Sequence, residues 1–175
     1  MKQLSLFNQE ILASDKSDAR VRSGHSWKLS VDGASRNNPG PSGAGIYLLK
    51  DNTVIEQRGY FLGIKTNNEA EYFALVLGLL IARDFITAAD EFTIISDSQL
   101  LVRQLQGIYK VRTDGLRPLH AVALRLMQSV NAQITHVLRA ENSEADKLAN
   151  LGIDKKRMVS QDLLLKLHQY ELSLS

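Results

Sequence analysis

The sequence predicts an α/β fold in which helices pack against a mixed β-sheet. Three segments with strand-like patterning come first, and a two-residue hairpin-like turn, Asp51-Asn52, separates the second from the third. Two further strand-like segments then alternate with segments of helical periodicity. Hairpins give antiparallel strand pairs and strand–helix alternation gives parallel ones, so the two halves together predict a mixed sheet.

Each expected strand has its own signal. Residues 27–32 (WKLSVD) alternate apolar and polar side chains and stop at a loop rich in Gly, Asn and Pro. Residues 92–96 (FTIIS) form a short apolar strand. The remaining strands are expected at residues 44–50, 53–62 and 134–138.

The expected helices follow from apolar spacing. A helix beginning near Asn68 has apolar residues at i, i+3 and i+4, as a helix packed on a sheet requires. Further helices are expected at residues 99–106, 115–130, 143–151 and 161–170, and Gly152 is expected to end the fourth of these as a C-terminal cap.

Composition limits the classes of function that the chain can have. The 175 residues are 44% hydrophobic, which suits one domain with a proper core. The longest apolar run, residues 73–82, is roughly half the ~20 residues that a membrane span needs, so we expect no membrane association and no secretory signal. The chain has no cysteine, which excludes disulfides and thiolate metal sites and agrees with a cytoplasmic location.

The chain divides into four parts by composition. We expect a terminal peptide at residues 1–7, a polar flexible linker at 8–26, a folded domain at 27–152 and a helical extension at 153–175. The net charge of +2 does not by itself indicate a nucleic-acid partner. Residues 103–125 are locally basic, which fits either a nucleic-acid contact or a solvated helix surface.

Four acidic residues lie where a strand or loop meets a helix: Asp32, Glu71, Asp97 and Asp146. One sheet could gather them into a carboxylate cluster, which suits Mg²⁺ and phosphodiester chemistry. Each has a structural alternative. Asp32 could belong to a turn, Asp97 could cap a helix, and Asp146 could complete a capping box with Ser143. Glu71 could be stabilised by the dipole of the helix in whose first turn it lies, although Glu69 is the better capping-box partner for Thr66.

The four segments around these acids, in this order, resemble the type 1 ribonuclease H family. The matching segments are VDGASRNNPGPSGAG, TNNEAEYFAL, ISDSQLLVRQL and HVLRAENSEADKLAN. The resemblance implies a ribonuclease H-like fold, with a five-stranded mixed sheet and helices on both faces. It also implies an endonuclease that hydrolyses the RNA strand of RNA/DNA hybrids to 5′-phosphate and 3′-hydroxyl ends.

The resemblance carries roles onto individual residues. It implies that Asp32, Glu71, Asp97 and Asp146 are the catalytic ligands of two Mg²⁺ ions, for which Mn²⁺ could substitute. It implies that Asn38, Asn68 and Gln99 contact the RNA strand and that Thr66 holds a phosphate of the DNA strand, although turn formation and helix capping are alternatives for all four.

Two features depart from the family pattern. Many members carry a mobile histidine before the last aspartate, whereas this chain has Arg139 near that place, and arginine cannot act as a general base. The interval from Asp97 to Asp146 has no room for the additional basic helix with which some relatives grip the hybrid. We therefore expect modest, salt-sensitive hybrid affinity.

The N-terminal residues Gln3, Leu4, Ser5, Leu6 and Phe7 resemble the peptide by which bacterial replication and repair proteins bind the DNA sliding clamp. Leu4, Leu6 and Phe7 offer apolar contacts and Gln3 offers polar ones. The alternative is a terminus folded back onto the domain. Two other functions stay open for the whole chain: a non-catalytic nucleic-acid or clamp adaptor, and a nuclease of the same fold that also cuts double-stranded RNA.

Overall fold

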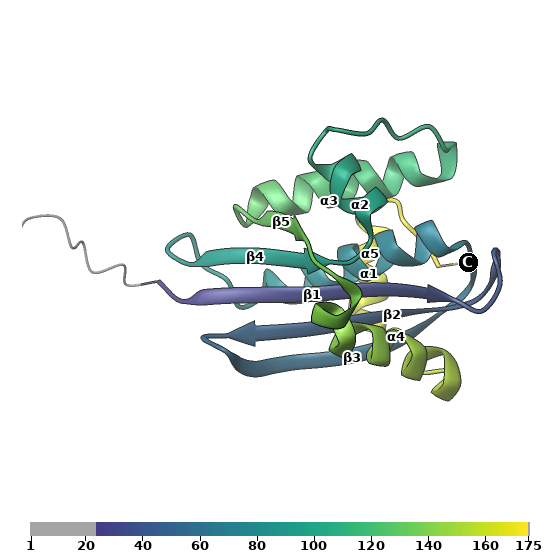
Figure 1. The fold of residues 1–175 in the computed structure, drawn as a ribbon, viewed down its shortest axis with the longest axis horizontal. Helices are drawn as coiled ribbons and strands as arrows, with labels where there is room; N and C mark the ends of the chain where they lie inside the picture. Colours follow the sequence, from purple (N-terminus) through teal and green to yellow (C-terminus); the bar gives the residue numbers. More distant parts are fainter. Residues whose placement is uncertain (1–23, 175) are drawn as a thin grey trace, which may run out of the picture.

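The computed structural model describes residues 24–174, which form one β-sheet with helices on both faces (Figure 1). The predicted clamp-binding residues, and residues 8–23 of the predicted linker, lie outside this range. The strands are β1 (Ser26–Ser35), β2 (Gly40–Lys50), β3 (Thr53–Lys65), β4 (Glu91–Ser96) and β5 (Gln133–His136). The helices are α1 (Asn67–Ala82), α2 (Gln99–Leu105), α3 (Arg117–Ser129), α4 (Ser143–Lys155) and α5 (Gln161–His168), with short 3₁₀ helices η1 (Asp114–Leu116) and η2 (Arg139–Asn142).

The sheet has the strand order β3-β2-β1-β4-β5. Strands β1, β2 and β3 pair antiparallel, while β4 pairs parallel with β1 and β5 parallel with β4. Asp51 and Asn52 both have positive φ, 48° and 65°, as a two-residue hairpin turn of the primed type requires. The predicted five-stranded mixed sheet and its first hairpin turn are therefore confirmed.

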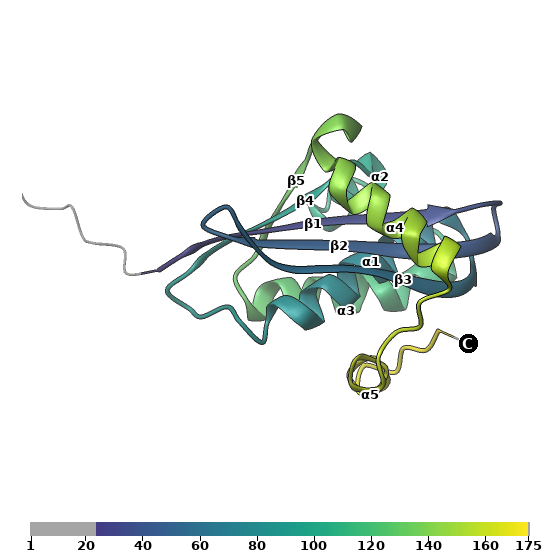
Figure 2. The same cartoon turned by 90° about the horizontal axis from the view of Figure 1, so that it is seen from below.

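The helices form two layers around this sheet. Helix α4 crosses one face, and α1 and α3 lie on the other (Figure 2). Helix α1 is apolar nearly all round because it lies between the sheet and the helices α3 and α5. The predicted arrangement with helices on both faces is confirmed.

Helix α4 does not end where the sequence predicted. Gly152 lies buried inside the helix, and a Cβ atom there would lie 2.5 Å from the carbonyl oxygen of Tyr60 in β3. The glycine permits close packing of helix on strand, and the helix continues to Lys155 before Lys156 takes the left-handed conformation, with φ 46°. The expected cap at Gly152 was wrong, and the boundary drawn there between domain and extension falls within a helix.

Strand β1 begins at Ser26, one residue before the predicted start of the first strand. The backbone N–H of His25 donates to Asp90, and that of Ser26 donates to Asp51. These contacts hold the start of β1 against the turns that precede β3 and β4.

The C-terminal extension packs beneath α1. Leu163 and Leu167 of α5 are buried, and the hydroxyl of Tyr170 accepts a hydrogen bond from Arg83 at 2.8 Å. An apolar cavity of about 450 Å³ lies between this extension and the end of β3. Within residues 24–174, no helix has the length and apolar character needed to cross a membrane.

Candidate active site

Two of the four acids have no capping role. Ser98, and not Asp97, is the N-cap of α2, and its hydroxyl accepts the N–H of Leu101. Helix α4 begins at Ser143 with Asn142 at the N-cap, so the capping box suggested for Ser143 and Asp146 does not form. The capping interpretations of Asp97 and Asp146 were therefore wrong, and both carboxylates are available for other contacts.

Asp32 and Glu71 are likewise not explained by turns or caps. Asp32 lies inside β1, paired with Gly45 of β2, and only 6% of it is exposed. The N-terminus of α1 is capped by the predicted box of Thr66 and Glu69, which leaves Glu71 buried without a capping role. Burying a carboxylate costs free energy unless charged or hydrogen-bonding partners compensate for it. Two buried acids without a capping role therefore indicate a functional site.

Helix α1 lies on the face of the sheet opposite to α4, and it brings Glu71 close to β1. The pairing of β1 with β4 ends at Ser30, so the following part of β1 is open on that side. Glu71 enters this opening, and its Oε2 accepts the N–H of Gly33 at 3.1 Å. A Cβ atom on Gly33 would lie 2.1 Å from the backbone nitrogen of Glu71, so this close approach of α1 and β1 needs a glycine.

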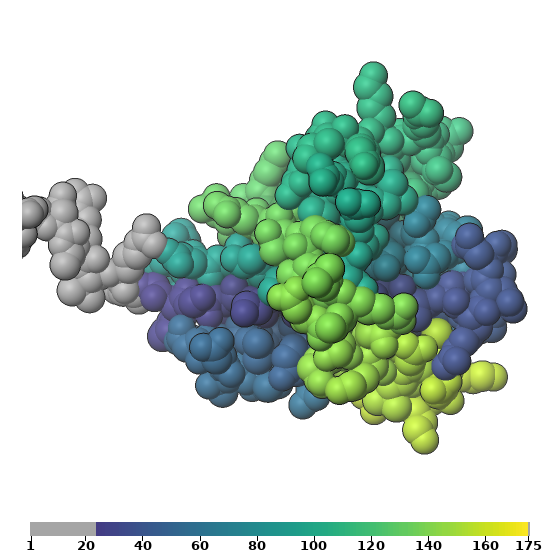
Figure 3. Space-filling model, in the orientation of Figure 1, coloured from purple at the N-terminus to yellow at the C-terminus, as the bar shows by residue number. Residues whose placement is uncertain are grey.

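A second glycine brings α4 close to the same strand. Gly45 is the β2 residue opposite Asp32, and a Cβ atom on it would lie 1.9 Å from the carbonyl oxygen of Ala145. The α4 backbone therefore lies almost directly on the sheet, one residue before Asp146. On this face η2 and α4 form a ridge across the middle of the molecule, with the segment that follows β4 beside it (Figure 3).

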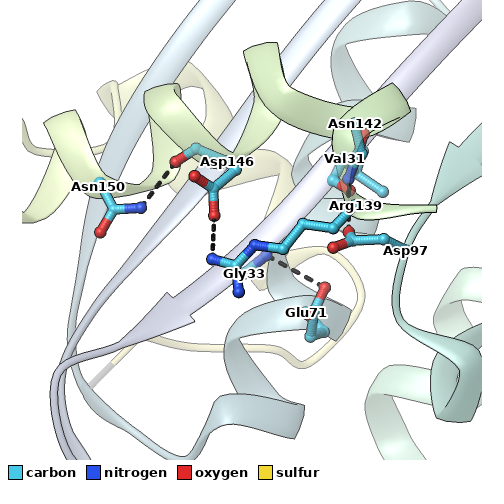
Figure 4. A network of polar contacts seen from close by, with 8 residues as sticks. All are labelled: Val31, Gly33, Glu71, Asp97, Arg139, Asn142, Asp146 and Asn150. Atoms are coloured by element: carbon cyan, nitrogen blue, oxygen red, sulfur yellow. Dashed lines mark hydrogen bonds and ion pairs between the residues drawn. The ribbon is translucent and has the colours of Figure 1, made fainter.

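The four carboxylates line one polar cleft of about 320 Å³, together with Ser35, Asn67, Arg139 and Asn150. The Arg139 side chain extends across the cleft, and its Nη2 lies 2.7 Å from Oδ1 of Asp146 (Figure 4). The predicted convergence of four distant segments is thus seen in the structure, with one added cation.

Burial and mutual repulsion alter the titration of the cluster. Burial, followed by the charges of Asp97 and Asp146, raises the pKa of Asp32 to about 7. Burial and the charges of Asp32 and Asp97 raise the pKa of Glu71 well above its ordinary value, while the hydrogen bond from Gly33 opposes this. These raising effects outweigh the lowering effect of Arg139, so both carboxyls favour the protonated form unless a cation lies nearby.

Comparison with known proteins identifies the family. Residues 30–152 match the family model described as "Reverse transcriptase-like". Ribonuclease HI of Halobacterium salinarum is 41% identical over 125 residues, which are 70% of this chain and 62% of that relative. The chain belongs to the type 1 ribonuclease H family. The crystal structure of RNase H1 from H. salinarum NRC-1 superposes with a TM-score of 0.70 at 38% identity, covering 74% of this chain and 98% of that one.

Another ribonuclease H of similar structure is LC11-RNase H1, solved in complex with an RNA/DNA hybrid. It is 32% identical, with a TM-score of 0.67, and the match covers 74% of this chain and 97% of that chain. This chain spans less than two thirds of the length of the H. salinarum ribonuclease HI.

The donor set suits the divalent ions on which ribonuclease H chemistry is expected to depend. The cleft offers carboxylate oxygens, which are the ligands Mg²⁺ and Mn²⁺ prefer, and the repulsion among these carboxylates favours a cation. Within residues 24–174, no three His, Asp or Glu side chains stand ready to enclose one ion.

Three of the four predicted substrate-binding residues lie together. Asn38, Thr66 and Asn68 line a second hollow of about 260 Å³ with Glu69 and Thr113. Part of their hydrogen-bonding capacity is already used, because Asn38 Oδ1 accepts the N–H of Asn67 at 2.9 Å and the Thr66 hydroxyl donates to Glu69 at 2.7 Å. Gln99 is exposed at the start of α2 and lines neither hollow.

Sequence reasoning missed some residues that line the cleft or contact its carboxylates. Asn142 is 1% exposed and donates to Asp97, yet an Asn before a helix is typical of an ordinary cap. Ser35, Asn67 and Asn150 also line the cleft and carry no sequence signal beyond their position near the acids. His136 is exposed, and its Nε2 lies 3.2 Å from the backbone oxygen of Asp97, so it does not replace the family's loop histidine in the cleft.

Proposed function

We propose that this protein is a metal-dependent endonuclease that hydrolyses the RNA strand of RNA/DNA hybrids. One observation carries the proposal: four carboxylates from β1, α1, α4 and the end of β4 line one open cleft, and none of them serves as a turn or cap residue. A family member of similar structure has been solved with an RNA/DNA hybrid, which supports the choice of substrate. The absence of cysteine fits our further proposal of a cytoplasmic location.

The residues of the cleft have separable tasks in this proposal. Asp32, Glu71, Asp97 and Asp146 would hold the metal ions, two Mg²⁺ or Mn²⁺. When bound, these ions supply Lewis-acid stabilisation and a hydroxide nucleophile. Arg139 is 77% exposed and already spans the cleft, so its guanidinium can attract a substrate phosphate.

Hybrid selection would come from groups beside the cleft. Asn38, Asn68 and Gln99 carry amides that both donate and accept, which suits contact with a 2′-hydroxyl, while Thr66 is proposed to meet the DNA backbone. Lys110 and Arg112 are exposed cations in the segment before η1 and can add phosphate contacts. Hybrid affinity should therefore fall steeply with salt, and an affinity unchanged between low and high salt would contradict these contacts.

The experiment compares the wild type with Asp97→Asn on labelled RNA/DNA, RNA/RNA and DNA/DNA duplexes, in Mg²⁺, Mn²⁺ or chelator. We expect RNA-strand cleavage in the hybrid with either metal, none with chelator, and a loss of at least about 10³-fold in Asp97→Asn, because the substitution keeps the size and removes the charge. Asp162→Asn is the matched control, because Asp162 is an exposed acid on α5 that pairs only with Lys166.

The other outcomes separate the alternatives. Hybrid binding without any metal-dependent cutting would replace the proposal with the adaptor function. Comparable cleavage of RNA/RNA duplexes would broaden the specificity to double-stranded RNA.

We also propose that residues 3–7 bind a bacterial DNA sliding clamp and place the nuclease near replicating DNA. Their sequence supports this, through Leu4, Leu6, Phe7 and Gln3. The residues between peptide and domain would tether the enzyme to the clamp and so raise its effective concentration at DNA.

The clamp proposal is tested by calorimetric titration of a purified bacterial sliding clamp with the full chain. We expect binding in the wild type and its loss in the double variant Leu6→Ala, Phe7→Ala, with hybrid cleavage unchanged. Equal clamp affinity in both proteins would refute it.

A further inference from the structure

The amide of Asn142 connects three of the segments that build the cleft. Its Nδ2 donates to Oδ1 of Asp97 at 2.7 Å and to the backbone oxygen of Val31 at 2.9 Å (Figure 4). Val31 precedes Asp32 in β1, Asp97 follows β4, and Asn142 itself stands at the start of α4. One side chain thus fixes the spacing between the strands and the helix that carry Asp32, Asp97 and Asp146.

The chemistry of the contacts determines which way this amide points. Both partners, a carboxylate and a carbonyl, are acceptors, so only the NH₂ group can face them. Both of its hydrogens are then in use. An aspartate at this position would have the same size but would place a negative charge against two acceptors.

Asn142 makes these contacts instead of the ones that its position favours. An asparagine at an N-cap ordinarily accepts a backbone N–H of the first turn, a contact that stabilises the helix. Within residues 24–174, α4 has no side-chain cap, and the Asn142 Oδ1 is buried without a hydrogen-bond partner. A buried acceptor without a partner is destabilising, so this residue lowers the stability of the fold. Such losses of stability are typical of functional sites.

We propose that Asn142 is a positioning residue of the catalytic centre, which holds the Asp97 carboxylate in the orientation needed to bind a metal ion. This inference rests on the proposed function. Groups that orient metal ligands without touching the metal commonly change metal affinity by 10–100-fold when they are removed. Asp97 has particular need of such a group, because it follows the last residue of β4 and has no strand pairing of its own.

The test measures Mn²⁺ binding and hybrid cleavage separately in the full chain. Mn²⁺ affinity is determined by titration calorimetry without nucleic acid, and kcat and KM are measured at several Mn²⁺ concentrations. For Asn142→Ala and Asn142→Asp we expect Mn²⁺ affinity to fall about 10–100-fold. We expect kcat to fall at low Mn²⁺ and to recover partly at high Mn²⁺, with the KM for hybrid within about threefold of the wild type, because Asn142 is too buried to meet the substrate.

The matched control is Gln104→Ala. Gln104 is also a buried amide, and it accepts a hydrogen bond from Tyr72 at 2.9 Å without lining the cleft. Its loss should lower the melting temperature and leave Mn²⁺ affinity unchanged. If neither Asn142→Ala nor Asn142→Asp folds, Asn142→Ser, which keeps one donor in a smaller side chain, is measured in their place.

The outcomes are separable from those of the proposed function. Mn²⁺ affinity and kcat within twofold of the wild type in folded Asn142→Ala or Asn142→Asp, or in Asn142→Ser where neither of these folds, would overturn the inference, as would an equal loss of Mn²⁺ affinity in Gln104→Ala. If the wild type does not cleave hybrids, the proposed function fails, and the Mn²⁺ titration still decides whether Asn142 orients Asp97.

Discussion

Removing the charge of Asp32 should stabilise the metal-free protein, although it removes a proposed metal ligand. The pKa of Asp32 is raised from 3.8 to about 7, first by burial and then by Asp97 and Asp146. This difference corresponds to about 4 kcal/mol, because each pKa unit is worth about 1.4 kcal/mol. The Asp32→Asn variant has a similar size and no charge, so it avoids this cost.

The sign of the pH dependence follows from the raised pKa. Below pH 3.8 the carboxyl is protonated in the folded and the unfolded chain, and Asp32 contributes no penalty. Between pH 3.8 and about 7 the folded chain keeps a proton that the unfolded chain has released, so the free energy of unfolding falls as the pH rises, and this loss is complete above about pH 7. The advantage of Asp32→Asn should therefore be full near pH 8 and should shrink toward pH 4.

The assay is urea denaturation followed by circular dichroism in chelator at pH 8, 7, 6 and 5. At pH 8 we expect the free energy of unfolding of Asp32→Asn to exceed that of the wild type by about 4 kcal/mol. The Asp162→Asn control removes an exposed charge and should change the free energy of unfolding by less than about 1 kcal/mol at every pH. A wild type as stable as Asp32→Asn at pH 8, or a difference that does not depend on pH, would show that the cluster carries no electrostatic strain.

Three further predictions concern the cation, the close packing and the extension. Arg139→Ala should raise the KM for hybrid roughly tenfold through loss of a charged phosphate contact, measured by steady-state cleavage; an unchanged KM would contradict that contact. Gly45→Ala should cost about 3 kcal/mol or more, since its Cβ would meet Ala145, whereas Gly115→Ala, with its nearest neighbour at 3.9 Å, should stay within about 0.5 kcal/mol in chemical denaturation. Leu167→Ala should cost about 2–5 kcal/mol of unfolding free energy and leave kcat unchanged, so a large fall in kcat would place α5 in the catalytic process.

The sequence predicted the sheet and most helices because local patterns determined them. Strand β4 is bounded by polar residues and α1 carries a capping box, so both were placed within a residue. The end of α4 was missed for a tertiary reason. A glycine near the end of a helical pattern has the same sequence signal whether it ends the helix or lies against a strand, and only the contact with Tyr60 distinguishes the two.

The candidate site was predictable to a similar extent. The segments around the four acids singled them out. The sequence could not exclude that these acids are cap or turn residues, because that depends on which residue takes the N-cap position. Asn142 illustrates the limit in the other direction. Its position predicts a cap, and its actual contacts with Asp97 and Val31 depend on segments 45 and 111 residues away along the chain.

The departures at the candidate site share one physical cause, which is the cost of holding several carboxylates together. The fold brings α1 and α4 unusually close to β1 through Gly33 and Gly45, and in doing so it buries Asp32 and Glu71 beside other acids. Burial first, and then the charges of Asp97 and Asp146, raise the pKa of Asp32. Arg139 relieves part of the repulsion between these charges from the surface, and Asn142 holds Asp97 in place from below without adding positive charge. A neutral amide can fix the geometry while the negative charge that would attract a divalent cation is kept, and a buried lysine or arginine in its place would cancel that attraction.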